Sequence, residues 1–217
     1  MSTPKVSVLM TAYNSEAFIA ETIESVLAQT MQDFEFVIVD DGSIDQSLAI
    51  IRQYATKDAR IKVVSRPNTR ISKASNDGLA ICVGEVVARI DSDDVAMPHR
   101  FSTQLAYLKQ SGAVCVGCFV DYMDAKGRFV TTIRSPVDND SIQRALLAGH
   151  CALWHTGSMY IRDAVEKVGG YDEDFDCALD LDLVHDQALQ HLLFEYLRRR
   201  LALASLLDLS QHAVHRR

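Results

Sequence analysis

Short apolar runs alternate with helical patterns along the first half of this chain, and that alternation constrains the fold more than any other feature. The apolar runs, which we expect to form strands, cover residues 6–10, 34–39, 61–65 and 85–90. Apolar residues at helical spacing predict helices over 18–27, 45–54 and 71–81, and a fourth helix with Pro98 in its first position. Because the strands are apolar along their whole length, the pattern predicts a parallel sheet covered by helices on both faces. Sheets of this kind bind ligands at the carboxyl ends of their strands.

The second half of the chain has a different pattern. The expected elements are strands at 114–120, 128–133 and 158–161, a turn at 124–127, a short helix at 141–147, and a long leucine-rich helix from about Asp182 to Leu209. No internal repeat or low-complexity linker separates the two halves, so we expect one compact body.

Composition excludes several classes of protein. The chain has 29 acidic and 22 basic residues, a net charge of −7, which argues against a nucleic-acid-binding protein. No apolar run approaches the roughly 20 residues that cross a bilayer, and the N-terminus lacks a signal-peptide core, so we expect a cytoplasmic protein. Five scattered cysteines argue against a disulfide scaffold. Cys115 and Cys118, three residues apart in a predicted strand, should point to opposite faces.

Two clusters of aspartates follow predicted strands directly. Asp40 and Asp41 follow the second strand, and Asp91, Asp93 and Asp94 follow the fourth. Neighbouring carboxylates repel one another and lose hydration, and a bound divalent cation compensates for both effects. Clusters of oxygen ligands suit Mg²⁺ or Mn²⁺, which commonly bridge protein carboxylates to substrate phosphates. The alternative is that these aspartates only shape turns and cap helices, which is our interpretation of Asp45 alone.

Several motifs, taken in order, resemble the family 2 glycosyltransferases. They are Val6-Ser7-Val8-Leu9-Met10-Thr11-Ala12-Tyr13-Asn14, Asp40-Asp41-Gly42-Ser43-Ile44-Asp45, Asn76-Asp77-Gly78-Leu79-Ala80, Asp91-Ser92-Asp93-Asp94 and Val168-Gly169-Gly170-Tyr171-Asp172-Glu173. The resemblance covers roughly residues 4 to 183. It implies an α/β protein of the GT-A (Rossmann-like) fold, a three-layer sandwich with a mostly parallel central sheet, to which the leucine pattern adds a helical C-terminal segment. It also implies inverting transfer from a nucleotide-diphosphate sugar.

The resemblance implies a role for each matching residue of the donor half, residues 1–110. Those that would line the nucleobase pocket or bind the base are Thr11, Ala12, Tyr13, Asp41 and Asp40. Asp91 and Asp93 would hold the ribose and a Mn²⁺ or Mg²⁺ ion, with Asp94 as an alternative ligand. Arg66, Arg70 and Lys73 are basic residues between the two clusters that could reach the base or the diphosphate; solvated surface charge is the alternative for each.

The acceptor half, residues 111–217, would supply the catalytic base. Inversion by single displacement needs a carboxylate that takes the proton of the attacking hydroxyl. The family's base follows the Gly-Gly-aromatic-Asp-Glu stretch, which makes Asp180 the candidate here, although Leu179 stands where the family usually has glutamate. Asp182 could share the task, and Asp180 could alternatively cap the last helix. His155 beside Trp154 could face the acceptor or belong to a packed loop.

The chain departs from the family pattern in places. Arg70 stands where relatives often have glycine and Ser75 where they often have arginine, and beyond Leu183 the pattern no longer matches. The Arg198-Arg199-Arg200 run beside leucines could dock peripherally on an acidic membrane surface. Core packing, or pairing of this helix in a homodimer, is the alternative use.

Three functions remain open from the sequence. The leading one is a cytoplasmic glycosyltransferase, which could act at the inner face of the membrane, with a saccharide or lipid-linked acceptor in cell-surface polysaccharide or glycoconjugate synthesis. The second is a nucleotide-sugar-binding protein with impaired catalysis, suggested by Leu179. The third is a phosphohydrolase with an aspartate nucleophile, suggested by the Asp91-Ser92-Asp93 pattern after a strand. That chemistry would not require the first aspartate cluster.

Overall fold

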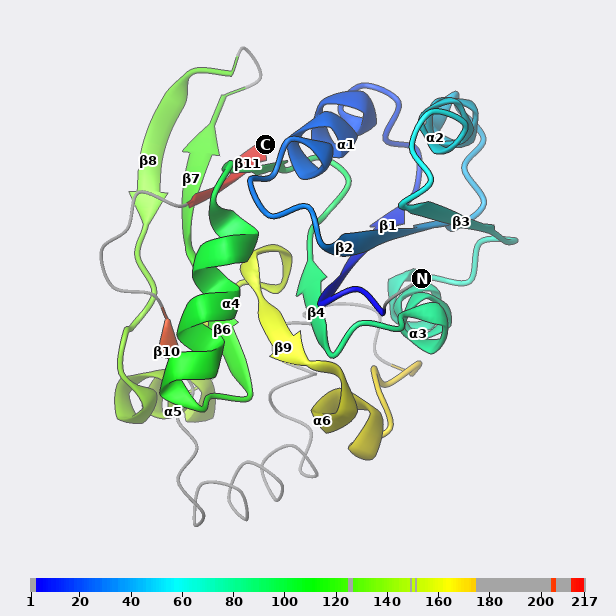
Figure 1. Ribbon diagram of the computed structural model, residues 1–217. Coiled ribbons are helices and arrows are strands. Elements are labelled where there is room, and N and C mark those ends of the chain that lie inside the picture. Colours follow the sequence, from blue (N-terminus) through cyan, green and yellow to red (C-terminus); the bar gives the residue numbers. More distant parts are fainter. Residues whose placement is uncertain are drawn as a thin grey trace.

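The centre of the molecule is a set of four parallel strands, which Figure 1 shows between the helices. In this computed structural model, which describes residues 3–124, 127–148, 150, 152–174, 204–205 and 212–216, these strands are β1 (Val6–Ala12), β2 (Phe34–Asp40), β3 (Ile61–Ser65) and β4 (Val86–Arg89). They are neighbours in the order β4-β1-β2-β3. The sheet continues beyond β4 with β9 (Met159–Ile161), β6 (Cys115–Gly117) and β10 (Ala204–Ser205). Because only the β9 pairings are antiparallel among these, the mostly parallel sheet predicted from the sequence is confirmed.

Helices cover both faces of this sheet and complete three layers. The helices are α1 (Ile19–Leu27), α2 (Ser47–Ala55), α3 (Ile71–Ile81), α4 (Arg100–Ser111), α5 (Asn139–Leu147) and α6 (Arg162–Lys167). Val8 and Met10 of β1 face α1, α2 and α4 in one apolar core, whereas Leu9 faces α3, α5 and α6 in the other. Successive side chains of a strand point to opposite faces, so a strand covered on both sides must be apolar throughout.

A second sheet lies beside the first. Its strands are β5 (Val95–Ala96), β11 (His212–Arg216), β7 (Phe119–Met123) and β8 (Phe129–Ile133), in that order. The predicted strand at 114–120 is wrong in one respect, because it is two strands, β6 and β7, that belong to different sheets and separate at Cys118. The buried Gln104 side chain donates to the carbonyl oxygens of Gly117 (3.1 Å) and Gly157 (2.8 Å) at this separation. Cys115 and Cys118 are free thiols.

The C-terminal prediction needs correction where the structure describes it. Residues 204–205 fall inside the predicted helix but form strand β10, which pairs with β6. Residues 212–216 form β11, which pairs with β7 and β5. Strands at the edge of a sheet carry unpaired backbone groups, and pairing with them stabilises an extended segment whatever its local helical spacing. The rest of 182–209 lies outside the described residues.

Two helices begin at other residues than the sequence predicts, because backbone groups near the predicted first residue form hydrogen bonds outside the helix. Helix α2 begins at Ser47, whose backbone N–H donates to Asp45 Oδ1 (2.9 Å). Helix α4 begins at Arg100 and not at Pro98, whose carbonyl oxygen instead accepts from Thr30 N (2.8 Å). Strand β5 and helix α6 were not predicted from the sequence. Within the described part of the chain, no helix combines the length and apolarity that a bilayer crossing requires.

Buried polar side chains hold the end of β4 against α4. The guanidinium of Arg100 is fully buried and donates to the carbonyl oxygen of Arg89 (2.5 Å) and to Gln104 Oε1 (3.1 Å). Burial lowers the pKa of Arg100, yet the group keeps its hydrogen bonds to the strand. These contacts set where β4 ends and therefore where the second aspartate cluster begins.

A buried carboxylate anchors the opposite, amino-terminal edge of the strands. Glu35 Oε1 accepts from Ser7 Oγ (2.5 Å) and from Val83 N (2.6 Å), and Lys62 Nζ lies 2.5 Å from Oε2. Burial alone would raise the pKa of Glu35, but the hydrogen bonds from Lys62, Ser7 and Val83 lower it below the ordinary 4.5. The stabilisation is therefore present above pH 4.5 and is lost as the pH falls through the lowered pKa.

We predict that Glu35→Gln destabilises the protein by about 1 to 3 kcal/mol at pH 7, because it removes charge-assisted hydrogen bonds from a buried network. The difference from the wild type should shrink as the pH falls below 4.5, which urea unfolding at several pH values would measure. Asp33→Asn, which breaks an exposed 3.2 Å ion pair with Lys5, is the control and should cost less than about 0.5 kcal/mol. An equal effect of both substitutions would contradict this account.

Candidate functional site

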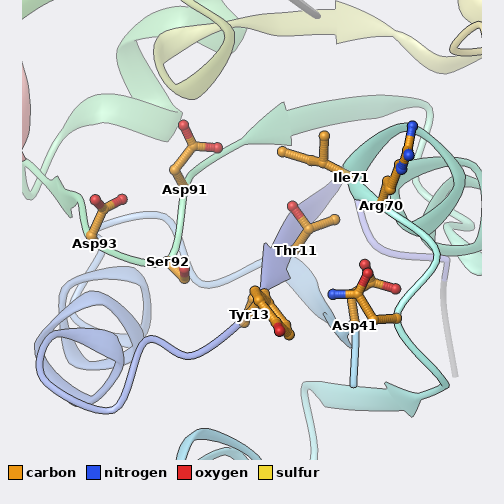
Figure 2. A pocket seen from close by; sticks show the side chains of 10 residues that line it. Thr11, Tyr13, Asp41, Arg70, Ile71, Asp91, Ser92 and Asp93 are labelled. Carbon is orange, nitrogen blue, oxygen red and sulfur yellow. The ribbon is translucent and has the colours of Figure 1, made fainter. Parts of the chain in front are cut away.

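A pocket of about 480 Å³ opens at the carboxyl edge of the central strands. Its lining comes from both aspartate clusters and from the loop before α3: Thr11, Ala12, Tyr13, Asp41, Asn68, Arg70, Ile71, Asp91, Ser92 and Asp93. Figure 2 shows Asp41, Arg70 and Ile71 on one side, Asp91 and Asp93 on the other, and Thr11 with Tyr13 between them. Asp41 of the first predicted cluster and Asp93 of the second therefore line the same pocket.

The register of the parallel strands brings these residues together. Ala12 of β1 lies opposite Asp40 of β2, and Leu9 lies opposite Arg89 of β4. Beyond the sheet, Asn14 and the turn after β2 bind each other: Asn14 N donates to Ser43 Oγ (3.0 Å), and Ile44 N donates to Asn14 Oδ1 (2.9 Å). Asn14 has a positive φ of 50°, which asparagine tolerates better than most residues. These contacts leave the ring of Tyr13 half exposed at the mouth of the pocket.

The two aspartates after β2 have different environments. Asp40 does not line the pocket; it is buried, and its carboxylate accepts from Ser43 N and Ser65 Oγ, both at 3.3 Å. Asp41 lines the pocket, and its Oδ1 accepts from Thr69 N (3.0 Å) and lies 3.5 Å from Arg66 Nε. Both aspartates are buried, and of the two only Asp41 lines the pocket.

Among the three basic residues singled out in the sequence, the structure brings only Arg70 to the pocket lining. Arg66 pairs with Asp41 and with Asp77, and Lys73 Nζ lies 3.6 Å from Glu173 Oε2. A ligand contact by Lys73 therefore stays a prediction that the lining of the pocket does not favour.

Arg70 has a strained backbone. Its φ of 76° and ψ of 162° lie in a region that essentially only glycine occupies. A non-glycine residue held there costs roughly 1 to 3 kcal/mol. The family resemblance implies glycine at this position, and Arg70 has a backbone conformation that suits glycine.

The second aspartate cluster is fixed by a short 3-10 helix, η1 (His155–Gly157). Thr156 Oγ1 accepts from Asp91 N (3.1 Å) and donates to Asp94 Oδ2. Asp94 is fully buried by this contact and does not line the pocket, whereas Asp91 and Asp93 do. Ser92 Oγ lies 2.6 Å from Ser15 Oγ, which ties the cluster to the start of α1.

His155 lies next to Asp91, and its side chain is only 10% exposed. Its Nε2 is 2.9 Å from the Tyr171 hydroxyl, and its Nδ1 is 3.9 Å from Asp91 Oδ1. Burial, and secondarily the charge of Arg89, lowers the pKa of His155 well below its usual value, so the ring is neutral near pH 7. Trp154 packs edge-to-face with Tyr122, at a centroid distance of 6.3 Å. The sequence left two interpretations of this segment open, a histidine that faces the acceptor and a packed loop. These contacts agree with the packed loop.

The residues of the pocket fit a hard divalent cation. Within the described part of the chain, no group of three or more His, Cys, Asp or Glu side chains is close enough to hold a metal by itself. Where a substrate phosphate also coordinates Mg²⁺ or Mn²⁺, the protein needs to supply only one or two carboxylates. Water molecules are the other ligands. Asp91 and Asp93 lie in the same pocket and supply such a pair.

The candidate base Asp180 lies outside the described residues, as do Leu179 and Asp182. The described chain leads toward it through Tyr171, whose backbone is held by α3. Asn76 Nδ2 donates to Tyr171 O (2.9 Å), and Tyr171 N donates to Asn76 Oδ1 (2.8 Å). These two hydrogen bonds hold the segment at Tyr171 against α3. The first residue of α3, Ile71, lines the pocket.

Three lining residues were not predicted from the sequence: Asn68, Ile71 and Ser92. Ser92 could have been found, because it stands between Asp91 and Asp93. Asn68 and Ile71 carry no local signal, and they reach the pocket only because the loop after β3 packs on the turn at Gly42. A Cβ added to Gly42 would lie 2.6 Å from Asn68 N.

We predict that Gly42→Ala destabilises the protein by about 2 kcal/mol or more, since φ is +76° and the added Cβ would collide with the backbone of the 66–68 loop. Thermal unfolding would measure the loss. Gly169→Ala is the matched control: φ is +95°, but nothing lies within 4 Å of its added Cβ, so only the backbone cost remains. A loss for Gly42→Ala no larger than for Gly169→Ala would contradict the packing argument.

Solved structures with the same architecture include S. aureus TarS and an archaeal mannosyltransferase. S. aureus TarS (residues 1–349) superimposes with a TM-score of 0.76 at 23% identity over 98% of this chain and 60% of that one. A mannosyltransferase of Pyrobaculum calidifontis, in complex with GDP-Man and Mn²⁺, superimposes with a TM-score of 0.69 at 16% identity over 99% of this chain and 57% of that one. At these identities the likeness shows the fold, and the predicted GT-A architecture is confirmed.

Sequence comparisons reach further. An uncharacterized glycosyltransferase of Nostoc is 35% identical over 76% of this chain and 53% of its own length. The O-antigen biosynthesis glycosyltransferase WbnJ of Escherichia coli is 29% identical over 79% of this chain and 69% of its own. The putative glycosyltransferase EpsE of Bacillus subtilis is matched over only 40% of its length. Several of these curated relatives are therefore much longer than the matched segment.

The match to a known family covers most of the chain and includes both aspartate clusters. The sequence model described as glycosyl transferase family 2 matches residues 7–169. This range runs from β1 through the pocket-lining loops to the end of α6. The chain belongs to glycosyl transferase family 2.

Proposed function

We propose that this protein is an inverting glycosyltransferase that moves a sugar from a nucleotide-diphosphate sugar to an acceptor hydroxyl with the help of a divalent cation. The observation that carries the proposal is the shared pocket of Asp41 and Asp93. The two carboxylates lie on two sides of one pocket, which supports a nucleoside site at Asp41 and a cation site at Asp93.

The relatives support a nucleotide-sugar donor. TarS has been crystallised with UDP and with UDP-GlcNAc, and the Pyrobaculum enzyme with GDP-Man and Mn²⁺. WbnJ acts in O-antigen biosynthesis, and chondroitin synthase of Escherichia coli is another relative, 28% identical over 83% of this chain. We transfer to this chain the donor class and a role in cell-surface polysaccharide or glycoconjugate synthesis, with a saccharide or lipid-linked acceptor.

The nucleoside would lie between Tyr13 and Asp41. Tyr13 is 49% exposed, which leaves a ring face for stacking on a base. Asp41 keeps Oδ1 in contact with Thr69 N and Arg66. Since a carboxylate oxygen accepts more than one hydrogen bond, the group can also accept from a base. Thr11 and Ala12 would form the floor between them.

Asp91 and Asp93 would hold the ribose and the cation. A divalent ion bound there would neutralise charge that grows on the phosphate oxygens of the leaving nucleoside diphosphate. Thr156 and Ser15 hold the backbone and Ser92 of this cluster in place, so the two carboxylates need little reorganisation when a ligand enters.

The acceptor half would provide the base. In a single displacement, the base accepts the proton of the acceptor hydroxyl while that oxygen attacks the anomeric carbon. We assign this to Asp180, with residues 1–110 as the donor half and 111–217 as the acceptor half. Action in the cytoplasm or at the inner membrane face, and a homodimer through the C-terminal segment, stay predictions.

We predict that Asp93→Asn lowers the affinity for UDP or GDP in the presence of Mn²⁺ at least tenfold, because it removes a ligand of the cation. Calorimetric titration with and without Mn²⁺ measures this. Asp163→Asn, on the exposed face of α6, is the control for loss of one negative charge and should bind as the wild type does. Unchanged Mn²⁺-dependent affinity in Asp93→Asn would exclude this residue from the cation site.

We predict that Asp180→Asn reduces release of nucleoside diphosphate from a donor sugar by a factor of about 10² to 10⁴, the usual contribution of a general base. Nucleotide affinity should stay within about twofold of the wild type. Asp182→Asn is the matched neighbour and should retain most of the turnover. Donor binding by the wild type without any turnover would instead support the catalytically impaired alternative. Phosphatase activity that needs Asp91 but no sugar nucleotide would support the phosphohydrolase.

A further inference from the structure

Tyr171 contacts parts of the molecule that are far apart in the sequence, and it is only 2% exposed. Its hydroxyl oxygen lies 2.9 Å from His155 Nε2 and 3.2 Å from the hydroxyl oxygen of Tyr160 in β9. Its ring packs edge-to-face on the imidazole of His155, with 5.5 Å between the ring centroids and 88° between the ring planes. A phenylalanine would fill the same space, so packing alone does not explain the hydroxyl.

The backbone of Tyr171 is held in place as well. The amide of Asn76 in α3 donates to Tyr171 O (2.9 Å) and accepts from Tyr171 N (2.8 Å). Gly170 precedes it at a φ of +83°, and a Cβ added there would lie 2.6 Å from Asn76 Oδ1, so a side chain at this position would collide with the amide. Backbone and ring of Tyr171 are therefore both fixed, and a fixed hydroxyl can orient the group that it contacts.

The imidazole that Tyr171 contacts lies against the candidate cation site. His155 Nδ1 is 3.9 Å from Asp91 Oδ1, and Asp91 lines the pocket on the side opposite Asp41 (Figure 2). The side chain of Asp91 is 32% exposed, so the carboxylate can contact His155 and a ligand together. A distance of 3.9 Å is too long for a hydrogen bond, but hydrogen bonds of functional sites are often long until the ligand binds.

The protons of the two tyrosines and the histidine have one favourable order. Burial raises the pKa of Tyr160 and of Tyr171, so both hydroxyls are protonated near pH 7. When Tyr160 donates to the oxygen of Tyr171, Tyr171 donates to Nε2, and the single proton of a neutral imidazole is on Nδ1, facing Asp91. The reverse order would place the lone pair of Nδ1 against a carboxylate, which is electrostatically unfavourable.

We infer that Tyr171 is a positioning residue of the proposed cation site. Its hydroxyl holds His155 in the tautomer and orientation that present Nδ1–H to Asp91, and His155 in turn orients the carboxylate that a divalent cation or the ribose would meet. The inference rests on the proposed function and adds to it two buried residues outside the described lining of the pocket. Groups that orient a metal ligand commonly change metal affinity or activity by about 10- to 100-fold when they are substituted.

The experiment measures how much Mn²⁺ the full chain needs for nucleotide binding. UDP and GDP are titrated calorimetrically at a series of Mn²⁺ concentrations and in EDTA, and thermal unfolding verifies that each variant is folded. Tyr171→Phe removes only the hydroxyl. Tyr160→Phe is the matched control, because it removes a buried hydroxyl that forms no hydrogen bond with His155 in the described part of the chain. His155→Gln keeps a polar atom near Nε2 and removes Nδ1.

Tyr171→Phe and His155→Gln should each raise the Mn²⁺ concentration for half-maximal nucleotide binding about tenfold. Tyr160→Phe should stay within about twofold of the wild type, because Tyr171 can still donate to Nε2. The double variant Tyr171→Phe/His155→Gln should need no more Mn²⁺ than either single variant, since both substitutions interrupt the same chain of contacts. Any binding in EDTA should be the same in all variants, whereas a general loss of structure would weaken it too.

The outcomes separate this inference from the proposed function. If the wild type shows no Mn²⁺-dependent nucleotide binding, the proposed function fails at its cation and the inference fails with it. If the wild type shows such binding and Tyr171→Phe needs no more Mn²⁺ than the wild type, or Tyr160→Phe needs as much as Tyr171→Phe, the positioning role is overturned while the proposed function stands. Additive effects in the double variant would overturn the action of Tyr171 through His155.

Discussion

The candidate site depends on the parallel register of β1 with its two neighbours. Ala12 lies opposite Asp40, and Leu9 lies opposite Arg89, so the segments after all three strands leave the sheet at one edge. Asp41, Tyr13 and Asp91 reach the same pocket for this reason alone. A slip of one residue in any of these pairings would move a carboxylate to the other face of the sheet and separate the two clusters.

The aspartates at this edge of the sheet are of two kinds. Asp40 and Asp94 are buried and hydrogen-bonded to hydroxyl or backbone donors, so they hold loops. Asp41, Asp91 and Asp93 line the pocket, where a ligand or cation can reach them. Each buried carboxylate requires such donors, because desolvated charge is costly without them. The polar network around the cluster is therefore part of the site even where it does not face the pocket.

The loop before α3 shows how a single residue can alter a shared architecture. Arg70 keeps a backbone conformation suited to glycine, and it lines the pocket on the same side as Asp41. In general, loops vary more than the elements that they connect, so one fold can carry different functional sites.

The sequence by itself determined the layered α/β architecture and the edge at which the site lies, because apolar strands and the charges after them are local patterns. It indicated both aspartate clusters, but it could not separate Asp41 from Asp40, or Asp93 from Asp94. That distinction depends on Ser65 and Thr156, which are distant in sequence. Only the tertiary structure divided 114–120 between two sheets, made 204–205 a strand, and brought Asn68 and Ile71 to the pocket. Each of these follows from long-range pairing or packing, which local spacing does not record.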